Sequence, residues 1–166
     1  MIEIFEESSS DTKEIEELLD LIFGPGRNAL GSYRFRHGVG PVSKLCLTMR
    51  DEFNVLVGVI RFWPILIGMQ RSSGLLLGPL GVHPTRQGES LGEILISNGL
   101  RKAKSLGWLR VVLVGDIDYY KRFGFSRSLM DNIYLDDKTS NERLLGSELV
   151  EGSMTNLSGP LFNILE

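Results

Sequence analysis

The sequence predicts a mixed α/β (α+β) fold, with a mostly antiparallel central sheet flanked by helices. Three β-rich segments, 44–49, 55–63 and 74–82, are joined by short turns, which predicts an antiparallel meander. A helical pattern then runs from 92 to about 106, with a packing face made of Gly92, Ile96, Gly99, Ala103 and Leu106. The segment 110–114 that follows is short and almost wholly apolar, which is typical of a strand buried on both faces.

The other expected elements lie on either side of this block. Ile15, Leu18, Leu19 and Ile22 recur at helical spacing, and Gly24-Pro25-Gly26 ends the helix that they predict. The remaining elements are, in chain order, a strand over 2–5, a short helix over 28–36, a short helix over 116–123, strands over 127–135 and 143–150, and a mostly irregular tail over 152–166. A length of 166 residues predicts one domain, residues 1–166.

Composition argues against several classes of protein. Lys and Arg number 18 against 21 Asp and Glu, and a net charge of −3 is unlike the basic charge of most nucleic-acid-binding domains. Cys46 is the only cysteine and is expected in the core, so neither a disulfide within the chain nor a cysteine-based zinc site is expected, and no metal is predicted. No apolar stretch is long enough to span a bilayer and no secretory signal is visible, which predicts a cytoplasmic protein with no membrane contact.

The expected strand 74–82 is unusual because it contains Gly74, Gly78, Pro79 and Gly81. Proline removes a donor from the hydrogen-bond ladder, and glycine in a strand marks a bulge or a close approach by another group. A central strand that stops pairing midway leaves backbone groups free for a ligand. We therefore expect the sheet to be splayed in its middle.

The loop 83–92 leads from this strand into the long helix and contains Gly88 and Gly92. Backbone N–H groups at the start of a helix bind anions, so the loop is expected to hold a phosphate or pyrophosphate. Two common nucleotide motifs do not fit. The chain has no Walker A run, and its glycines at 78 and 81 lack the spacing of the dinucleotide-binding fingerprint.

The segment from Gly78 to Gly92, which ends in the run Gln-Gly-Glu-Ser-Leu-Gly, resembles the acyl-CoA loop of the GCN5-related N-acetyltransferases (the GNAT family). In that family a Gln/Arg-x-x-Gly-x-Gly/Ala motif joins a splayed central strand to a helix. The run Tyr119-Tyr120-x-x-Phe-Gly-Phe is similar to the family's tyrosine-then-Gly-Phe segment. Gly115-Asp116 before it resembles a bacterial subgroup of small predicted acetyltransferases. The resemblance covers about residues 40–135.

This resemblance implies an enzyme that transfers the acetyl group of acetyl-CoA to a primary amine by direct attack. It implies that a strand at the break, Leu80, Gly81 and Val82, offers backbone groups to the pantetheine arm. It implies that the loop holds the pyrophosphate, through Gln87, Gly88, Glu89, Ser90, Leu91 and Gly92. It gives Tyr120 the role of protonating the departing CoA thiolate, which suits a phenol with an ordinary pKa of about 10. A backbone N–H at the break is expected to polarise the thioester carbonyl.

Several other side chains have two interpretations each. Asp116 is a catalytic candidate as a contact or base for the substrate amine, or it is the N-cap of the helix after it. Arg122, with Lys121 beside it, binds CoA phosphates or lies on a solvated face. Tyr119 is structural or lines the substrate site, and His83 is expected only to shape its turn.

The function also has alternatives. Ser90 stands where the family has its first loop glycine, and Glu89 stands where a basic residue is common, which motivates a non-catalytic acyl-CoA-binding or regulatory domain of the same fold. A third alternative is a partner-binding module that uses the apolar hairpin around Phe62 and Trp63. The acceptor is open between a small-molecule amine and a protein amine, and a homodimer is open as well.

Overall fold

The computed structural model describes residues 1–27, 31–135 and 138–166. Its strands are β1 (Glu3–Glu6), β2 (Leu47–Arg50), β3 (Leu56–Ile67), β4 (Ser72–Val82), β5 (Arg110–Val114), β6 (Ile133–Tyr134), β7 (Leu144–Glu148) and β8 (Gly159–Asn163). Its α-helices are α1 (Thr12–Phe23), α2 (Leu91–Ser105) and α3 (Ile117–Tyr120). Its 3-10 helices are η1 (Ser9–Asp11), η3 (Gly31–Arg36), η4 (Ser43–Leu45), η5 (Pro84–Arg86), η6 (Lys121–Phe123), η7 (Ser128–Met130) and η8 (Lys138–Arg143).

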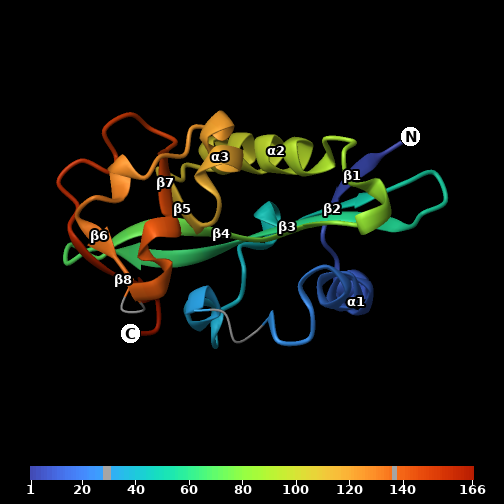
Figure 1. Cartoon of the computed structure of the whole chain (residues 1–166), viewed down its shortest axis with the longest axis horizontal. Coiled ribbons are helices and arrows are strands. Elements are labelled where there is room, and N and C mark those ends of the chain that lie inside the picture. Colours follow the sequence, from blue (N-terminus) through green and yellow to red (C-terminus); the bar gives the residue numbers. More distant parts are fainter. Residues whose placement is uncertain (28–30, 136–137) are drawn as a thin grey trace.

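The central sheet has the strand order β1-β2-β3-β4-β5-β7. Neighbouring strands along this order pair antiparallel, except that β4 and β5 run parallel. Figure 1 shows α2 and α3 on one face of the sheet and α1 on the other. The predicted fold class is therefore confirmed. The predicted meander is β2, β3 and β4, and the predicted buried strand is β5.

The parallel contact between β4 and β5 is short. Leu75 pairs with Val111 and Leu76 pairs with Val112, and no further pair joins the two strands although β4 continues to Val82. From Leu76 onward the two strands therefore diverge, and the sheet is splayed in its middle, as the sequence predicts.

A bulge in β4 lies where this pairing stops. Gly78 and Pro79 together lie opposite the single residue Arg61 of β3. A bulge bends its strand and disrupts the ladder locally, and the proline has no N–H to donate. The unusual composition of this strand thus accounts for the splay.

Helix α2 packs on β3 and β4 through one buried face, made of Leu91, Leu95, Ile96, Gly99 and Ala103. Gly99 allows a close approach, because a Cβ there would lie only 2.6 Å from the ring of Phe62. The sequence also predicts Leu106 on this face, which is wrong. Leu106 is the C-cap residue and is 43% exposed.

Helix α1 packs on the opposite face, where Ile15, Leu18, Leu19, Leu56 and Val59 form a buried cluster. Two glycines of β4 are explained by packing of this kind. A Cβ at Gly81 would lie 2.8 Å from Ile22 of α1, and one at Gly74 would lie 2.5 Å from Ile67. At both positions the group that approaches the glycine closely is therefore an isoleucine side chain of the protein itself.

The expectations were weakest near the C-terminus. Of the strand predicted over 127–135, residues 128–130 form η7 instead, and only β6 is extended. The predicted irregular tail contains β8, which pairs with β3 at Ile65–Ile67 and with β6. Of the helix predicted over 28–36, residues 28–30 lie outside the described residues and the rest is η3.

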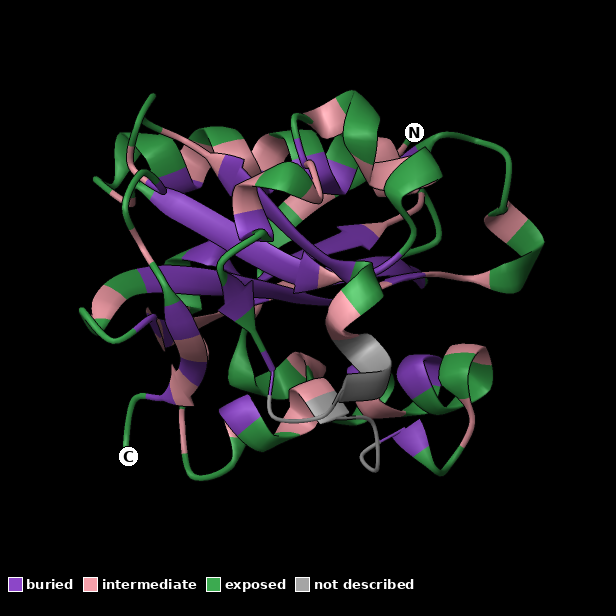
Figure 2. Cartoon of the chain, turned by 60° about the vertical axis from the view of Figure 1, so that its left-hand side comes forward, coloured by how far each residue is buried: buried purple, intermediate pink, exposed green. Residues whose placement is uncertain are grey.

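Burial rules out the apolar hairpin as a docking surface at its expected centre. Phe62 has no exposed surface, and Trp63 is only partly exposed, with its indole nitrogen bonded inside the protein. Cys46 is buried as predicted. Figure 2 shows the strands as the buried layer and the helices exposed on their outer sides.

Candidate active site

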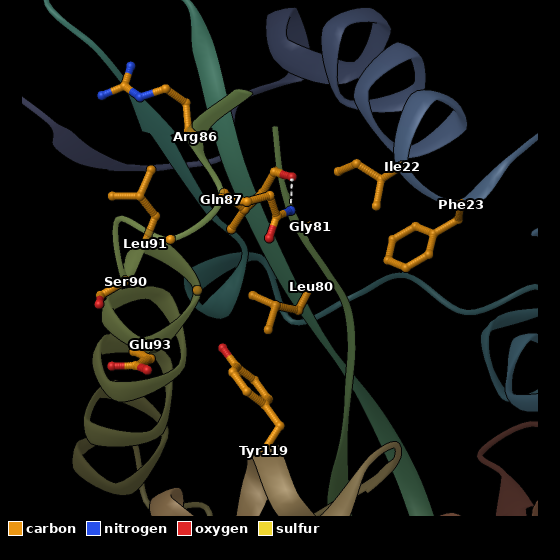
Figure 3. A pocket seen from close by; sticks show the side chains of 13 residues that line it. Ile22, Phe23, Leu80, Gly81, Arg86, Gln87, Ser90, Leu91, Glu93 and Tyr119 are labelled. Atoms are coloured by element: carbon orange, nitrogen blue, oxygen red, sulfur yellow. Dashed lines mark hydrogen bonds between the residues drawn. The ribbon is translucent and has the colours of Figure 1, made fainter. Parts of the chain in front are cut away.

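Two cavities meet where β4 and β5 diverge. The first has a volume of about 520 Å³ and lies between α1, β4 and the start of α2 (Figure 3). It is lined by Ile22, Phe23, Leu80, Gly81, Val82, Arg86, Gln87, Gly88, Ser90, Leu91, Gly92, Glu93 and Tyr119. Eight of the residues that the sequence predicts for acyl-CoA binding occur in this lining: Leu80, Gly81, Val82, Gln87, Gly88, Ser90, Leu91 and Gly92. Their spatial grouping is a finding, and their roles stay predictions.

The loop before α2 takes a path that favours glycine. Gly88 has φ +88°, and Ser90, the N-cap residue of α2, has φ +61° and ψ +22° in the left-handed region. Ser90 therefore adopts the conformation that the family's glycine adopts freely. The loop then runs directly into the N-terminus of a 15-residue helix, where N–H groups without helical partners attract anions.

Glu89 does not line the first cavity. Its two carboxylate oxygens accept hydrogen bonds from Arg86, at 2.7 Å from Nε and 3.0 Å from Nη2. These bonds hold the pKa of Glu89 below its usual range. The acidic residue in the loop is thus paired with a cation, and Arg86, which also contacts Asp51 at 3.3 Å, is the residue that faces the cavity.

Arg122 is also paired. Its guanidinium donates to Glu93 of α2 and lies over the ring of Tyr119, at 5.2 Å from the ring centroid. Arg122 does not line either of these two cavities, whereas Glu93 lines the first. A contact between Arg122 and a CoA phosphate would require this pair to separate, so that role stays a prediction.

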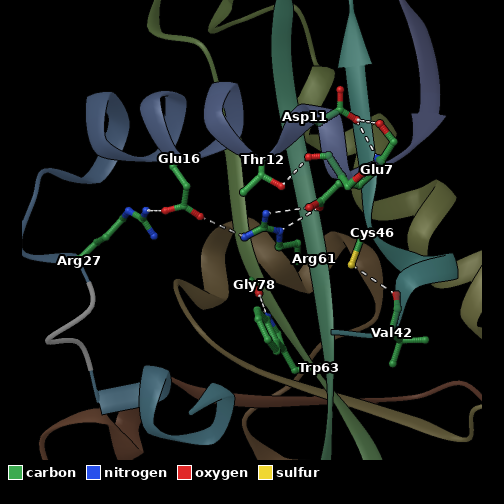
Figure 4. Close-up of polar contacts among 12 residues, drawn as sticks. Glu7, Asp11, Thr12, Glu16, Arg27, Val42, Cys46, Arg61, Trp63 and Gly78 are labelled. Atoms are coloured by element: carbon green, nitrogen blue, oxygen red, sulfur yellow. Dashed lines mark hydrogen bonds and ion pairs between the residues drawn. The ribbon is translucent and has the colours of Figure 1, made fainter. Parts of the chain in front are cut away.

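Side chains fix both ends of the free part of β4. Trp63 donates its indole N–H to the carbonyl of Gly78 at 2.6 Å, as Figure 4 shows. Gln87 donates to the carbonyl of Val82 at 3.0 Å (Figure 3). The sequence predicts Gln87 as a cofactor-binding residue, and here its amide holds the strand that borders the cavity.

The second cavity has a volume of about 320 Å³ and lies beyond the bulge. It is lined by Phe23, Ser32, Tyr33, Arg36, Leu76, Leu77, Gly78, Pro79, Leu80, Leu113, Val114, Gly115, Asp116, Tyr119, Tyr120 and Arg143. Phe23, Leu80 and Tyr119 line both cavities, so the two share a wall at the open edge of β4. A thioester held in the first cavity could reach an amine held in the second.

Tyr120 lies in the wall of the second cavity and is mostly buried. Its ring makes edge contacts with Tyr119 and Phe125, at centroid distances of 5.0 and 5.9 Å, and packs so closely on Gly115 that a Cβ there would lie 2.6 Å from it. Burial raises the pKa of Tyr120 to about 12. The phenol is therefore protonated at neutral pH and has a proton to donate.

Asp116 serves as the N-cap of α3, because its carboxylate accepts a hydrogen bond from the backbone N–H of Asp118 at 3.0 Å. Its side chain is exposed and also lines the second cavity. The capping interpretation is thus confirmed, and contact with a substrate amine stays a prediction.

The sequence analysis did not predict several other residues that line the two cavities. Arg86 and Glu93 directly flank the predicted cofactor-binding residues 87–92, and this adjacency in sequence was a usable signal. Tyr33 and Arg36 of η3 reach the site only through long-range contact with β3 and β4, and no local sequence pattern predicts that contact.

Within the described residues, no group of three or more His, Cys, Asp and Glu is arranged to hold a metal ion. No described helix is long and apolar enough to cross a membrane.

The geometry combines a central strand that has left its neighbour, a loop that leads into a helix N-terminus and a buried, protonated tyrosine, and this combination suits acyl transfer from a thioester. Residues 12–125 match the model of the acetyltransferase (GNAT) family, and the chain belongs to that family. The resemblance found in the sequence is therefore confirmed.

Among relatives, the uncharacterized N-acetyltransferase YhbS of Escherichia coli K12 is 30% identical over 81 residues, which is 49% of this chain and 48% of that protein. The match thus spans about half the length of this curated relative. The crystal structure of E. coli YhbS in complex with CoA superposes with a TM-score of 0.80 at 22% identity, over 97% of this chain and 87% of that one. A GNAT family acetyltransferase from Brucella melitensis in complex with acetyl-CoA has a TM-score of 0.63 and 30% identity, over 76% and 83% of the two chains.

Proposed function

We propose that the protein transfers the acetyl group of acetyl-CoA to a primary amine by direct attack, in the cytoplasm. The observation that carries this proposal is the divergence of β4 and β5 after Leu76, which lets the phosphate-binding loop and the tyrosine-bearing cavity share one wall. Relatives crystallised with CoA and acetyl-CoA support the choice of co-substrate.

Acetyl-CoA would lie along the free edge of β4. Its pyrophosphate would bind the amides from Gly88 to Gly92, where the N-terminus of α2 supplies positive potential. Its pantetheine arm would run beside Leu80, Gly81 and Val82. Because Pro79 has no N–H, Leu80 supplies the first backbone donor after the bulge, and we assign to it the polarisation of the thioester carbonyl.

The reaction then needs no covalent intermediate on the protein. The amine nitrogen attacks the carbonyl carbon, the new C–N bond forms, and the C–S bond breaks as the tetrahedral intermediate collapses. The departing sulfur takes the phenolic proton of Tyr120, and the nitrogen releases its extra proton to solvent or to Asp116. Solvent returns a proton to Tyr120. General acid catalysis of this kind contributes typically about 10²–10⁴-fold.

Acetyl-CoA binding is tested by thermal melting. Ligand at 100 times its dissociation constant stabilises the folded state by about 2.7 kcal/mol, which for a chain of this size raises Tm by about 5–10 °C. No shift at millimolar acetyl-CoA contradicts both the enzyme and the binding-only alternative.

Turnover is tested by thiol release over a panel of primary amines. We expect release with wild type and a loss of about 10²-fold or more in kcat with Tyr120→Phe. Tyr134→Phe is the matched control, because Tyr134 is an exposed tyrosine outside both cavities. Binding without release across the panel favours the regulatory alternative. Unchanged turnover in Tyr120→Phe at every pH removes Tyr120 from the mechanism.

A further inference from the structure

The second cavity contains a cation with an unusual environment. Arg36, the last residue of η3, places its guanidinium over the ring of Tyr33 at 3.9 Å and over that of Trp63 at 5.5 Å from the centroids. Its Nη2 would lie 3.0 Å from a Cβ at Gly78, so the charged group is at the bulge of β4. The two aromatic rings and the bulge thus hold the guanidinium in one position beside the proposed place of reaction.

No carboxylate of the described residues is paired with Arg36. Its Nε is buried and has no hydrogen-bond partner. By contrast, Arg50 of β2 and Arg61 of β3 are each hydrogen-bonded to carboxylates, as Figure 4 shows for Arg61 and Glu7. Burial lowers the pKa of Arg36, but a guanidinium keeps its charge at neutral pH.

A buried polar atom without a partner is costly and calls for a physical explanation. The Nε itself is closed to solvent, so a ligand in the second cavity would meet Arg36 at the part of its side chain that lines the cavity. A guanidinium binds carboxylate there through two parallel hydrogen bonds. The aromatic rings fix the plane of the guanidinium before the ligand arrives, which reduces the ordering cost of binding.

The charges that line the second cavity also favour an anionic group on the ligand. Among the described residues of the lining, Arg36 and Arg143 are the cations and Asp116 is the only acid, although the whole chain carries a net charge of −3. Arg36 comes from η3 and Asp116 from the start of α3, on different sides of the cavity. The cavity volume of about 320 Å³ is at the small end for ligand sites, which suits a molecule of amino-acid size.

We infer that the acceptor is a small amine that also carries a carboxylate, such as a free amino acid, and that Arg36 binds this carboxylate while the amine faces the thioester. This inference rests on the proposed acetyl transfer. It assigns Arg36 to acceptor binding and leaves acetyl-CoA binding to the first cavity, which Arg36 does not line.

The test compares matched probes. The probes are the free L-amino acids, 4-aminobutyrate and β-alanine, each beside its carboxamide, and the readout is thiol release with saturating acetyl-CoA. A second readout is binding of the corresponding N-acetyl products in the presence of CoA, followed by fluorescence of Trp63 in a Trp108→Phe background, since the chain has two tryptophans.

We expect at least one carboxylate probe to exceed its carboxamide by tenfold or more in kcat/KM, or in the affinity of its product. Arg36→Gln should reduce that ratio to less than threefold, through KM of the acceptor, and should leave the acetyl-CoA melting shift unchanged. Arg36→Lys should retain part of the preference. Arg71→Gln is the matched control, because Arg71 stacks on Phe162 at 4.6 Å outside this cavity. The Arg71→Gln variant should retain the full preference for the carboxylate probe.

Two results overturn the inference. One is that no probe pair shows a carboxylate preference in either readout. The other is a preference that Arg36→Gln leaves intact, which would reduce Arg36 to a structural clamp between η3 and β4. Failure of the proposed function is separate, since it appears as the absence of any melting shift with acetyl-CoA.

Discussion

Ser90→Gly is expected to stabilise the protein, because Ser90 holds a left-handed backbone at φ +61° and ψ +22°. This conformation costs an L-residue about 1–2 kcal/mol, whereas glycine adopts it without that cost. Glycine in turn loses about 0.5–1 kcal/mol more conformational entropy on folding than a residue with a side chain. The side chain of Ser90 makes no capping hydrogen bond that would be lost. The net gain is about 0.5–1 kcal/mol.

For a chain of 166 residues this gain corresponds to a rise in Tm of about 1–4 °C. The assay is urea unfolding and thermal melting of wild type and Ser90→Gly. Ser105→Gly is the matched control with the opposite sign, because Ser105 lies in the right-handed last turn of the same helix and donates to the carbonyl of Lys102. The Ser105→Gly variant should lose about 0.5–1 kcal/mol of its free energy of unfolding.

The same variant tests whether the serine impairs ligand binding. If Ser90 follows the backbone path of a glycine, the loop amides are already in place, and the dissociation constant of acetyl-CoA should change less than threefold in Ser90→Gly. A lower Tm in Ser90→Gly, or a gain in acetyl-CoA affinity above tenfold, refutes the reasoning.

Three further predictions concern packing, pH and capping. Gly99→Ala should destabilise the protein by about 1 kcal/mol in urea unfolding, because overpacking against the ring of Phe62 costs about 1–3 kcal/mol and the higher helix propensity of alanine offsets about 1 kcal/mol. Ser97→Ala, on the exposed side of α2, is the control and should be neutral or stabilising. Because the pKa of Tyr120 is raised from 10.0 to about 12, its contribution to stability is present below pH 10 and is lost between pH 10 and 12, on the order of 2 kcal/mol; the difference between wild type and Tyr120→Phe in urea unfolding should shrink over that range, and a constant difference contradicts the burial of the phenol. Asp116→Ala should cost about 1 kcal/mol through loss of the N-cap, whereas Asp116→Asn should cost much less; equal losses would show that the cap is not what stabilises α3.

The parts of the fold that depend on local pattern were predictable. The meander, the long helix and the apolar strand each follow from short-range alternation, spacing and turn residues. The bulge was predictable as well, since Gly78 and Pro79 cannot both be accommodated in a regular central ladder. β8 was not, because its strand character depends on pairing with Ile65–Ile67, about a hundred residues earlier in the chain.

The candidate site divides in the same way. The loop from Gln87 to Gly92 and the tyrosine pair are contiguous in sequence, so a motif could reveal them. Tyr33 and Arg36 stack on each other, and the guanidinium of Arg36 also lies over Trp63, which is a tertiary contact. Pairing also decides what a charge can do, because Arg122 and Glu89 were predicted at the cofactor and are held by Glu93 and Arg86.

The central claim is that acetyl-CoA lies between the free edge of β4 and the loop before α2. The most direct measurement is a ¹H–¹⁵N NMR titration of the whole chain with acetyl-CoA. The account predicts saturable shifts in the amides of Leu80–Val82 and Gly88–Gly92, with those of β8 unchanged. An absence of shifts at millimolar acetyl-CoA, or shifts confined to residues outside both cavities, would contradict it.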